Sequence, residues 1–140
     1  MNANTSSRAI IFRILMILYI FAVGYLCFNN FKDIPSDLPK MLFGIPIDKV
    51  AHFCMFFPFP IIYYLSFKTL ARKPKKAVFW TLDTLVIGAT FAAITELIQK
   101  TISYRSGDWN DFKADILALA LACVVTLVLN LKNSLERAFK

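Results

Sequence analysis

The sequence predicts an all-α fold, an integral membrane four-helix bundle formed by a single domain over residues 1–140. Hydrophobic residues make up 58% of the chain, which exceeds the roughly 45–50% of an average soluble domain. In addition, four apolar segments follow one another along the chain, at approximately residues 10–28, 50–67, 77–98 and 112–131. At about 1.5 Å per residue, such segments are long enough to cross a hydrocarbon core of about 30 Å.

The charge of the chain is strongly positive, with a formal net charge of +7. A basic protein can bind nucleic acid, but here the basic residues lie between apolar segments and not along one face of a polar helix. Membrane lipids with anionic headgroups are therefore the expected partner, and nucleic acid is not. The spans and their connections use nearly the whole chain, so we expect no separate soluble catalytic domain. The sequence does not define an oligomeric state.

The first segment, residues 10–28, is interrupted only by Arg13, whose side chain can extend to the nearby headgroups. A cleaved signal peptide also carries basic residues before an apolar core. We favour a membrane span, because Tyr25 and Leu26 are bulky where a cleavage site needs small residues. Residues 29–47 are expected to form a loop near the membrane interface, since prolines and charges of both signs interrupt them.

The second segment, residues 50–67, carries Pro58 and Pro60 near its middle. Proline removes a backbone donor and kinks a helix, and neighbouring helices can supply partners for the freed carbonyls. We therefore expect a bent or irregular second span. A basic loop over residues 68–76 leads to the third segment, residues 77–98, and a polar stretch separates that segment from the fourth.

Four spans place both termini on one side of the membrane, and the basic residues predict which side. The two terminal regions and the loop over residues 68–76 carry most of the lysines and arginines, and that loop contains no acidic residue. On the opposite side the basic residues are offset by aspartates. Both termini are therefore predicted to be cytoplasmic, in a multi-pass protein of the cell membrane.

Polar residues gather at three places on the predicted extracytoplasmic side, where the second span starts, the third ends and the fourth begins. Spacings of three and four residues put the members of each group on one helix face. The three groups predict one polar pocket just below the outer headgroups. Its candidate ligand-binding residues are Asp48, Lys49 and His52, then Glu96 and Gln99, then Arg105, Asp108, Asp111 and Asp115.

In their order and spacing, these groups resemble the VanZ-like membrane proteins. The family pattern is Asp-Lys-x-x-His at the start of one span, Glu-x-x-Gln at the end of the next, and Arg followed by Asp at the head of the last. Roughly residues 47–121 carry the resemblance, and many family members have Asn at the position of Asp115. The resemblance implies a single VanZ-like transmembrane domain with a role in cell-envelope physiology, including susceptibility to glycopeptide antibiotics such as teicoplanin.

Two function classes fit these residues. In the first, the pocket binds an envelope or lipid-headgroup ligand without catalysis. In the second, the protein is an outer-leaflet enzyme that acts on a lipid-linked phosphate or envelope intermediate, with His52, Glu96 and Asp111 as candidate catalytic residues and Arg105 as a phosphate contact. No nucleophile is identified, so whether the protein is an enzyme stays open. A proton or ion path is a third class.

The sequence assigns no cofactor, and it identifies no metal site. A divalent cation is nevertheless compatible with the residues, because Glu96, Asp111 and Asp115 offer the hard oxygen ligands that Mg²⁺ and Ca²⁺ prefer.

Several candidates also have structural explanations. Asp108 suits the N-cap of the helix that follows, and Asp111 in the first turn suits the helix dipole. Glu96 can pair with Lys100 four residues later. Lys49 suits an interfacial anchor or a partner of an aspartate rather than a nucleophile.

A single histidine on an apolar helix is often only an interior hydrogen-bonding residue. Asp48, four residues before His52, is the carboxylate expected to fix its tautomer. Asp115 lies deeper in the membrane, where a carboxylate needs a partner, and Arg105, Lys113 and His52 are the candidates.

Overall fold

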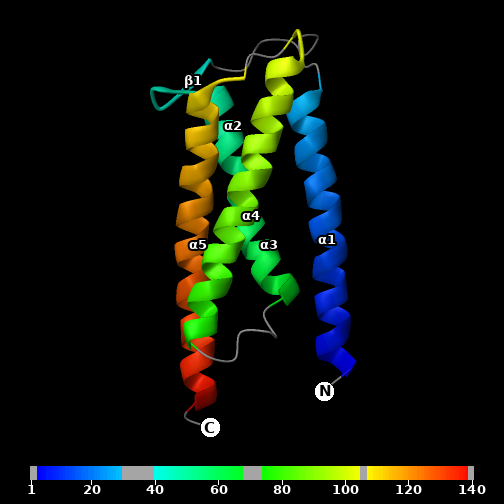
Figure 1. Cartoon of the computed structure of the whole chain (residues 1–140), viewed down its shortest axis with the longest axis vertical. Coiled ribbons are helices and arrows are strands. Elements are labelled where there is room, and N and C mark those ends of the chain that lie inside the picture. The colour runs from blue at the N-terminus through cyan, green and yellow to red at the C-terminus, as the bar shows by residue number, and fades with distance from the viewer. Residues whose placement is uncertain (1–2, 30–39, 68–73, 105–106, 139–140) are drawn as a thin grey trace.

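The computed structural model describes residues 3–29, 40–67, 74–104 and 107–138. The elements in chain order are α1 (Ala3–Phe28), β1 (Met41–Leu42), β2 (Ile45–Pro46), α2 (Ile47–Phe56), α3 (Pro58–Phe67), α4 (Pro74–Thr101) and α5 (Trp109–Ala138). The described residues contain 4 candidate membrane spans, Ser7–Phe28, Ile47–Phe67, Lys75–Thr101 and Trp109–Lys132. The prediction of an all-α, four-helix membrane bundle is therefore confirmed (Figure 1).

The helices extend beyond the apolar segments that indicate them in the sequence. α4 begins at Pro74, where the missing N–H has no cost because the first donors of a helix have no intrahelical partner. α5 begins at Trp109, directly after Asp108. Hydropathy detects only the part of a helix that lies in hydrocarbon, so these polar end turns fall outside the predicted spans.

The second span is broken at Phe57, as its prolines predict. Pro58 is the first residue of α3, and its ring nitrogen has no hydrogen to donate to the last turn of α2. The N–H of Phe57 donates to the carbonyl of Phe53 at 3.0 Å, and the hydroxyl of Tyr19 in α1 donates to the carbonyl of Met55. The break lets the two halves face different neighbours, since α2 packs mainly on α5 and α3 mainly on α1.

The sequence does not predict the antiparallel hairpin of β1 and β2, in which Met41 lies opposite Pro46. Its two central residues, Phe43 and Gly44, have φ angles of 52° and 79°. Two-residue hairpin turns that match the twist of the strands require such positive values. Glycine adopts them readily but an aromatic residue rarely does, so the local signal is weak. Figure 1 shows the hairpin projecting sideways from the bundle beside the start of α5.

The two ends of the bundle differ in which elements they contain. The start of α1 and the end of α5 lie together at one end, which we call the terminal end (Figure 1). α1 and α4 finish, and α2 and α5 begin, at the opposite end, which we call the far end. All three predicted polar groups belong to the far end.

The middle of the bundle is packed with apolar side chains. The ring of Phe91 in α4 lies 5.5 Å from that of Phe56 and 6.2 Å from that of Phe59, measured between centroids. Leu119 of α5 is fully buried beside them. A Cβ atom on Gly88 would lie 2.7 Å from Cδ2 of Leu119, so α4 and α5 approach closely at this glycine. We call Phe56, Phe59, Phe91 and Leu119 the apolar layer.

A second group of polar side chains lies on the other side of the apolar layer, toward the terminal end. The hydroxyl of Tyr63 donates to the carboxylate of Asp83 at 3.2 Å. Thr126 and Asn130 of α5 are 5% and 4% exposed. The apolar layer therefore separates two polar regions, one toward each end of the bundle.

The outward faces of the spans carry large apolar side chains. Phe21 in α1 is 74% exposed, Val86 in α4 is 65% exposed and Val128 in α5 is 59% exposed. A soluble protein rarely exposes such surface over contiguous areas, whereas lipid tails cover it without penalty. These side chains support a bundle surrounded by lipid.

Candidate functional site

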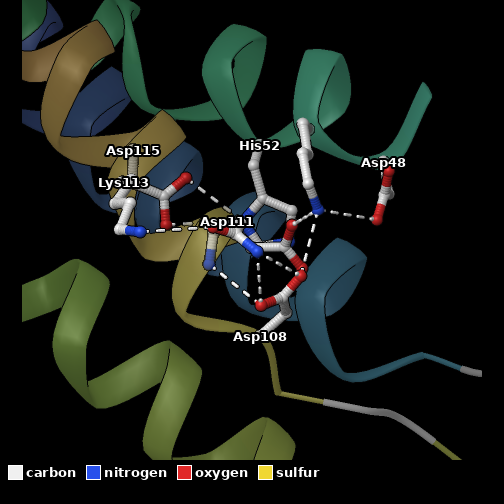
Figure 2. Close-up of polar contacts among 8 residues, drawn as sticks. Asp48, His52, Asp108, Asp111, Lys113 and Asp115 are labelled. Carbon is white, nitrogen blue, oxygen red and sulfur yellow. Dashed lines mark hydrogen bonds and ion pairs between the residues drawn. The ribbon is translucent and has the colours of Figure 1, made fainter. Parts of the chain in front are cut away.

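Ionisable side chains from α2, α4 and α5 meet inside the far end of the bundle. We define the far-end cluster as Lys49, His52, Glu96, Asp108, Asp111 and Asp115. Four of its members are at most 7% exposed, namely His52, Glu96, Asp111 and Asp115. Figure 2 shows the aspartates of α5 turned toward α2, as their predicted common face requires.

The deepest contact of the cluster joins His52 to Asp115. Nδ1 of His52 lies 3.1 Å from Oδ1 and 3.4 Å from Oδ2 of Asp115, and the Asp115 side chain is 0% exposed. His52 is thus the partner of Asp115, whereas Lys113 contacts Asn110 at 3.3 Å.

The prediction that Asp48 fixes the tautomer of His52 is wrong. The Asp48 side chain is 57% exposed, and its carboxylate lies 3.5 Å from the ammonium of Lys49. Asp48 occupies the first turn of α2 at the surface, while His52 lies one turn deeper. The carboxylate that contacts His52 comes from Asp115 on the facing helix.

Lys49 connects α2 to the start of α5. Its Nζ lies 2.8 Å from Oδ1 of Asp111 and 3.1 Å from Oδ2 of Asp108. The side chain of Asp111 is only 9% exposed, so this ion pair is partly withdrawn from water. The interpretation of Lys49 as the partner of an aspartate is confirmed.

Asp108 combines a structural role with its place in the cluster. Its Oδ1 accepts the backbone N–H of Asn110 at 3.0 Å, as an N-cap aspartate does. The same carboxylate accepts a hydrogen bond from Lys49. The Asn110 amide, followed by the Lys49 ammonium, holds the pKa of Asp108 below its ordinary value, because both stabilise the ionised form.

Glu96 differs from the other carboxylates of the cluster. It is 3% exposed, and neither Oε1 nor Oε2 has a hydrogen-bond partner among the described residues. The expected pair with Lys100 is replaced by another contact, since the ammonium of Lys100 lies 4.4 Å from the ring centroid of Trp109. Glu96 therefore carries a buried acceptor that makes no hydrogen bond of ordinary geometry in the described part of the chain.

Two further predicted site residues, Gln99 and Arg105, are not among the members of the far-end cluster. Gln99 is 4% exposed, but its Nε2 donates to the backbone carbonyl of Cys27 at 2.9 Å. Gln99 thus ties α4 to the last turn of α1 rather than offering that donor to a ligand. Arg105 lies outside the described residues.

The structure adds Gly107, which the sequence did not single out as a site residue. A Cβ atom there would lie 3.0 Å from Oε1 of Glu96 and 2.3 Å from Cγ of Lys100. The connection to α5 can lie this close to Glu96 only because residue 107 has no side chain. A glycine directly before a helix cap is the sequence signal that could have found it.

The described residues do not form a ready metal site. No group of three or more His, Cys, Asp and Glu side chains among them is placed to hold a metal ion. Of the three carboxylates that suggested Mg²⁺ or Ca²⁺, Asp111 is paired with Lys49 and Asp115 with His52.

Side-chain exposure falls steadily from the surface into the cluster. It is 57% for Asp48, 42% for Asp108, 22% for Lys49, 9% for Asp111 and 0% for Asp115. Polar side chains therefore extend from the surface of the far end to the buried His52 contact. A histidine oriented by a carboxylate can hold or transfer a proton, and the carboxylates can accept donors from a ligand.

Comparison with known proteins finds one family and one curated relative. The profile of the VanZ/LLP1 family matches residues 4–130. An uncharacterized protein of Schizosaccharomyces pombe is 31% identical over 94 residues, which cover 66% of this chain and 54% of that protein. The chain thus spans about half the length of this curated relative. No solved structure shows a significant match.

Proposed function

The chain belongs to the VanZ/LLP1 family, and on that premise we propose that it is a cell-membrane protein whose far-end cluster binds an envelope or lipid-headgroup ligand. The supporting observation is the burial of His52, Glu96 and Asp115 together within the spans. Ionisable side chains at the centre of a membrane helix cost about 2.5–3.5 kcal/mol each on insertion scales, and they usually mark a site or a pathway. Burial of several in one place supports a site.

We also propose that the far end faces the outside of the cell and that both termini are cytoplasmic. The support is the concentration of lysines and arginines in the terminal regions and in residues 68–76. In this orientation the cluster is accessible from the envelope side. A role in envelope physiology, including susceptibility to glycopeptides such as teicoplanin, follows as part of the same proposal.

The test is ligand-dependent thermal stability of the purified protein in detergent. We compare the wild type with Glu96→Gln, His52→Ala and the control Asp83→Asn, which removes a carboxylate far from the cluster but keeps an acceptor for Tyr63. Envelope lipids should raise the melting temperature of the wild type and the control only. Equal responses of all four proteins would reject the cluster as the binding site.

A second candidate function is an outer-leaflet enzyme acting on a lipid-linked phosphate or an envelope intermediate. The contact between His52 and Asp115 favours it, because a carboxylate that orients an imidazole is a common arrangement for general acid–base catalysis. Turnover of a lipid-linked phosphate by the wild type, lost in a folded His52→Gln variant, would support this function. Ligand binding without turnover would reject the enzyme function and retain the binding function.

A further inference from the structure

The far-end cluster contains more carboxylates than cations. Its four carboxylates, Glu96, Asp108, Asp111 and Asp115, face one lysine, Lys49, and one histidine, His52, and the exposed Asp48 lies beside Lys49. The excess is negative whether or not the histidine is protonated. An anionic group entering here meets like charges, whereas a cationic group meets attraction.

Lys49 shows that the cluster already holds an ammonium group. Its Nζ is surrounded by the carboxylates of Asp111 at 2.8 Å, Asp108 at 3.1 Å and Asp48 at 3.5 Å. These distances are those of charge-assisted hydrogen bonds and of a looser ion pair. The local geometry is therefore suited to a primary ammonium, which carries three N–H donors.

Glu96 is the carboxylate that this arrangement leaves without a donor. Both of its oxygens are buried and unpartnered among the described residues. Its carboxylate is within electrostatic range of Asp111, His52 and Asp115. The backbone of Asp108 also lies near the Glu96 carboxylate. It does not form a hydrogen bond of ordinary geometry with either oxygen. Buried carboxylates are normally paired, because desolvation without a partner is costly.

Resting on the proposed function, we infer that the ligand of the far-end cluster carries a primary ammonium group and that Glu96 is its acceptor. The carboxylates that attract the ammonium toward Glu96 are those of Asp108 and Asp111, whose side chains are 42% and 9% exposed. A divalent metal fits the described residues less well, since no three of their metal-ligating side chains converge. An ammonium needs only the two oxygens of Glu96 and one further acceptor.

The same chemistry can come from a lipid headgroup or from a free amine, and the experiment separates them. Native mass spectrometry of the detergent-solubilised protein measures retention of phosphatidylethanolamine, phosphatidylcholine and phosphatidylglycerol with identical acyl chains. Phosphatidylcholine controls for charge because its ammonium has no N–H donor. Phosphatidylglycerol controls for the phosphate. Free ethanolamine is added as a competitor. If it displaces the lipid, the amine alone is sufficient for binding.

Phosphatidylethanolamine should be retained about tenfold more strongly than the other two lipids, a preference of about 1.4 kcal/mol. Glu96→Gln should abolish the preference, and Asp83→Asn should keep it. Gly107→Ala is the second variant, in case Glu96→Gln fails to fold. It keeps the carboxylate but places a Cβ 3.0 Å from Oε1 of Glu96, and it should weaken retention by crowding.

Three results would overturn the inference. In the first, all three lipids, or phosphatidylglycerol alone, are retained, and His52→Ala abolishes the retention. The ligand then does not need a primary ammonium group, but the proposed binding of a headgroup stands. If no lipid is retained and Glu96→Gln raises the melting temperature, Glu96 is a protonated structural acid and the proposed function fails too. If no lipid is retained and Arg105→Gln lowers the melting temperature as much as Glu96→Gln does, Glu96 forms an ion pair with Arg105 and is not the acceptor of a ligand.

Discussion

His52 and Asp115 lie 63 residues apart in the chain, yet Nδ1 of the histidine is 3.1 Å from a carboxylate oxygen whose side chain has no exposed surface. This contact joins α2, the far-end half of the broken second span, to α5 inside the bundle. It is also the innermost point of the far-end cluster, which connects packing of the helices to the chemistry proposed for the site.

Removal of His52 should strongly destabilise the protein. His52→Ala leaves Asp115 buried without its partner, and loss of one member of a buried pair typically costs about 3–5 kcal/mol. Unfolding in mixed detergent micelles measures this free energy. Asp115→Asn, which keeps an acceptor for the imidazole, should cost less. A loss below about 1 kcal/mol for His52→Ala would show that the contact contributes little.

Replacement of Lys49 should weaken the junction between α2 and α5. Lys49→Met leaves the nearly buried Asp111 without its ammonium, and an unsatisfied buried polar group costs about 1–3 kcal/mol. The matched control is Lys113→Met, because Lys113 is exposed and donates to Asn110 at the surface, so its effect should stay within about 0.5 kcal/mol. Equal effects of the two variants in the same unfolding assay would contradict this assignment.

Two glycines in apolar spans should respond oppositely to alanine. At Gly88 the new Cβ would lie 2.7 Å from Leu119, and overpacking of this kind costs about 1–3 kcal/mol. At Gly24 a new Cβ would lie at an ordinary contact distance of 3.7 Å from the ring of Phe28, so Gly24→Ala should be neutral or stabilise the helix by up to about 1 kcal/mol. Leu119→Ala added to Gly88→Ala should relieve part of the cost, and thermal melts of all three variants check the ordering.

The charge of Asp108 should make stability depend on pH. Its folded-state pKa lies below the ordinary value of 3.8, so its stabilising effect is fully present above that value and is lost as the pH falls through the lowered pKa. Asp108→Asn keeps an acceptor for the N–H of Asn110 but removes the charge. Melting temperatures of the wild type and the variant should differ at neutral pH and converge in acid. In a Lys49→Met background the difference at neutral pH should shrink.

Much of the fold follows from residue patterns, because hydrophobic length alone indicates each span and Pro58 alone predicts the break after α2. The convergence of Lys49 and His52 with Asp111 and Asp115 follows from spacing and from the order of the spans. Residue spacing predicts which face of each helix is polar, and the alternating direction of the spans predicts that the start of α2, the end of α4 and the start of α5 lie together.

Other features depend on information that a local pattern does not contain. The choice of Asp115 over Asp48 as the partner of His52 depends on how α2 and α5 are rotated against each other. Gln99 donates to a backbone carbonyl of α1. Every residue has such a carbonyl, so the sequence of α1 does not indicate which one Gln99 contacts. The hairpin requires a positive φ at Phe43, which the residue type disfavours.

The apolar layer also has a consequence for the voltage dependence of the proposed binding. In the described residues, Phe56, Phe59 and Leu119 separate the far-end cluster from the polar group around Asp83, and a low-dielectric layer of this kind carries most of the drop in membrane potential. Moving one elementary charge through 100 mV is worth about 2.3 kcal/mol, but in the proposed orientation a cation that binds at Glu96 crosses little of that field. Its binding should therefore be nearly independent of the membrane potential.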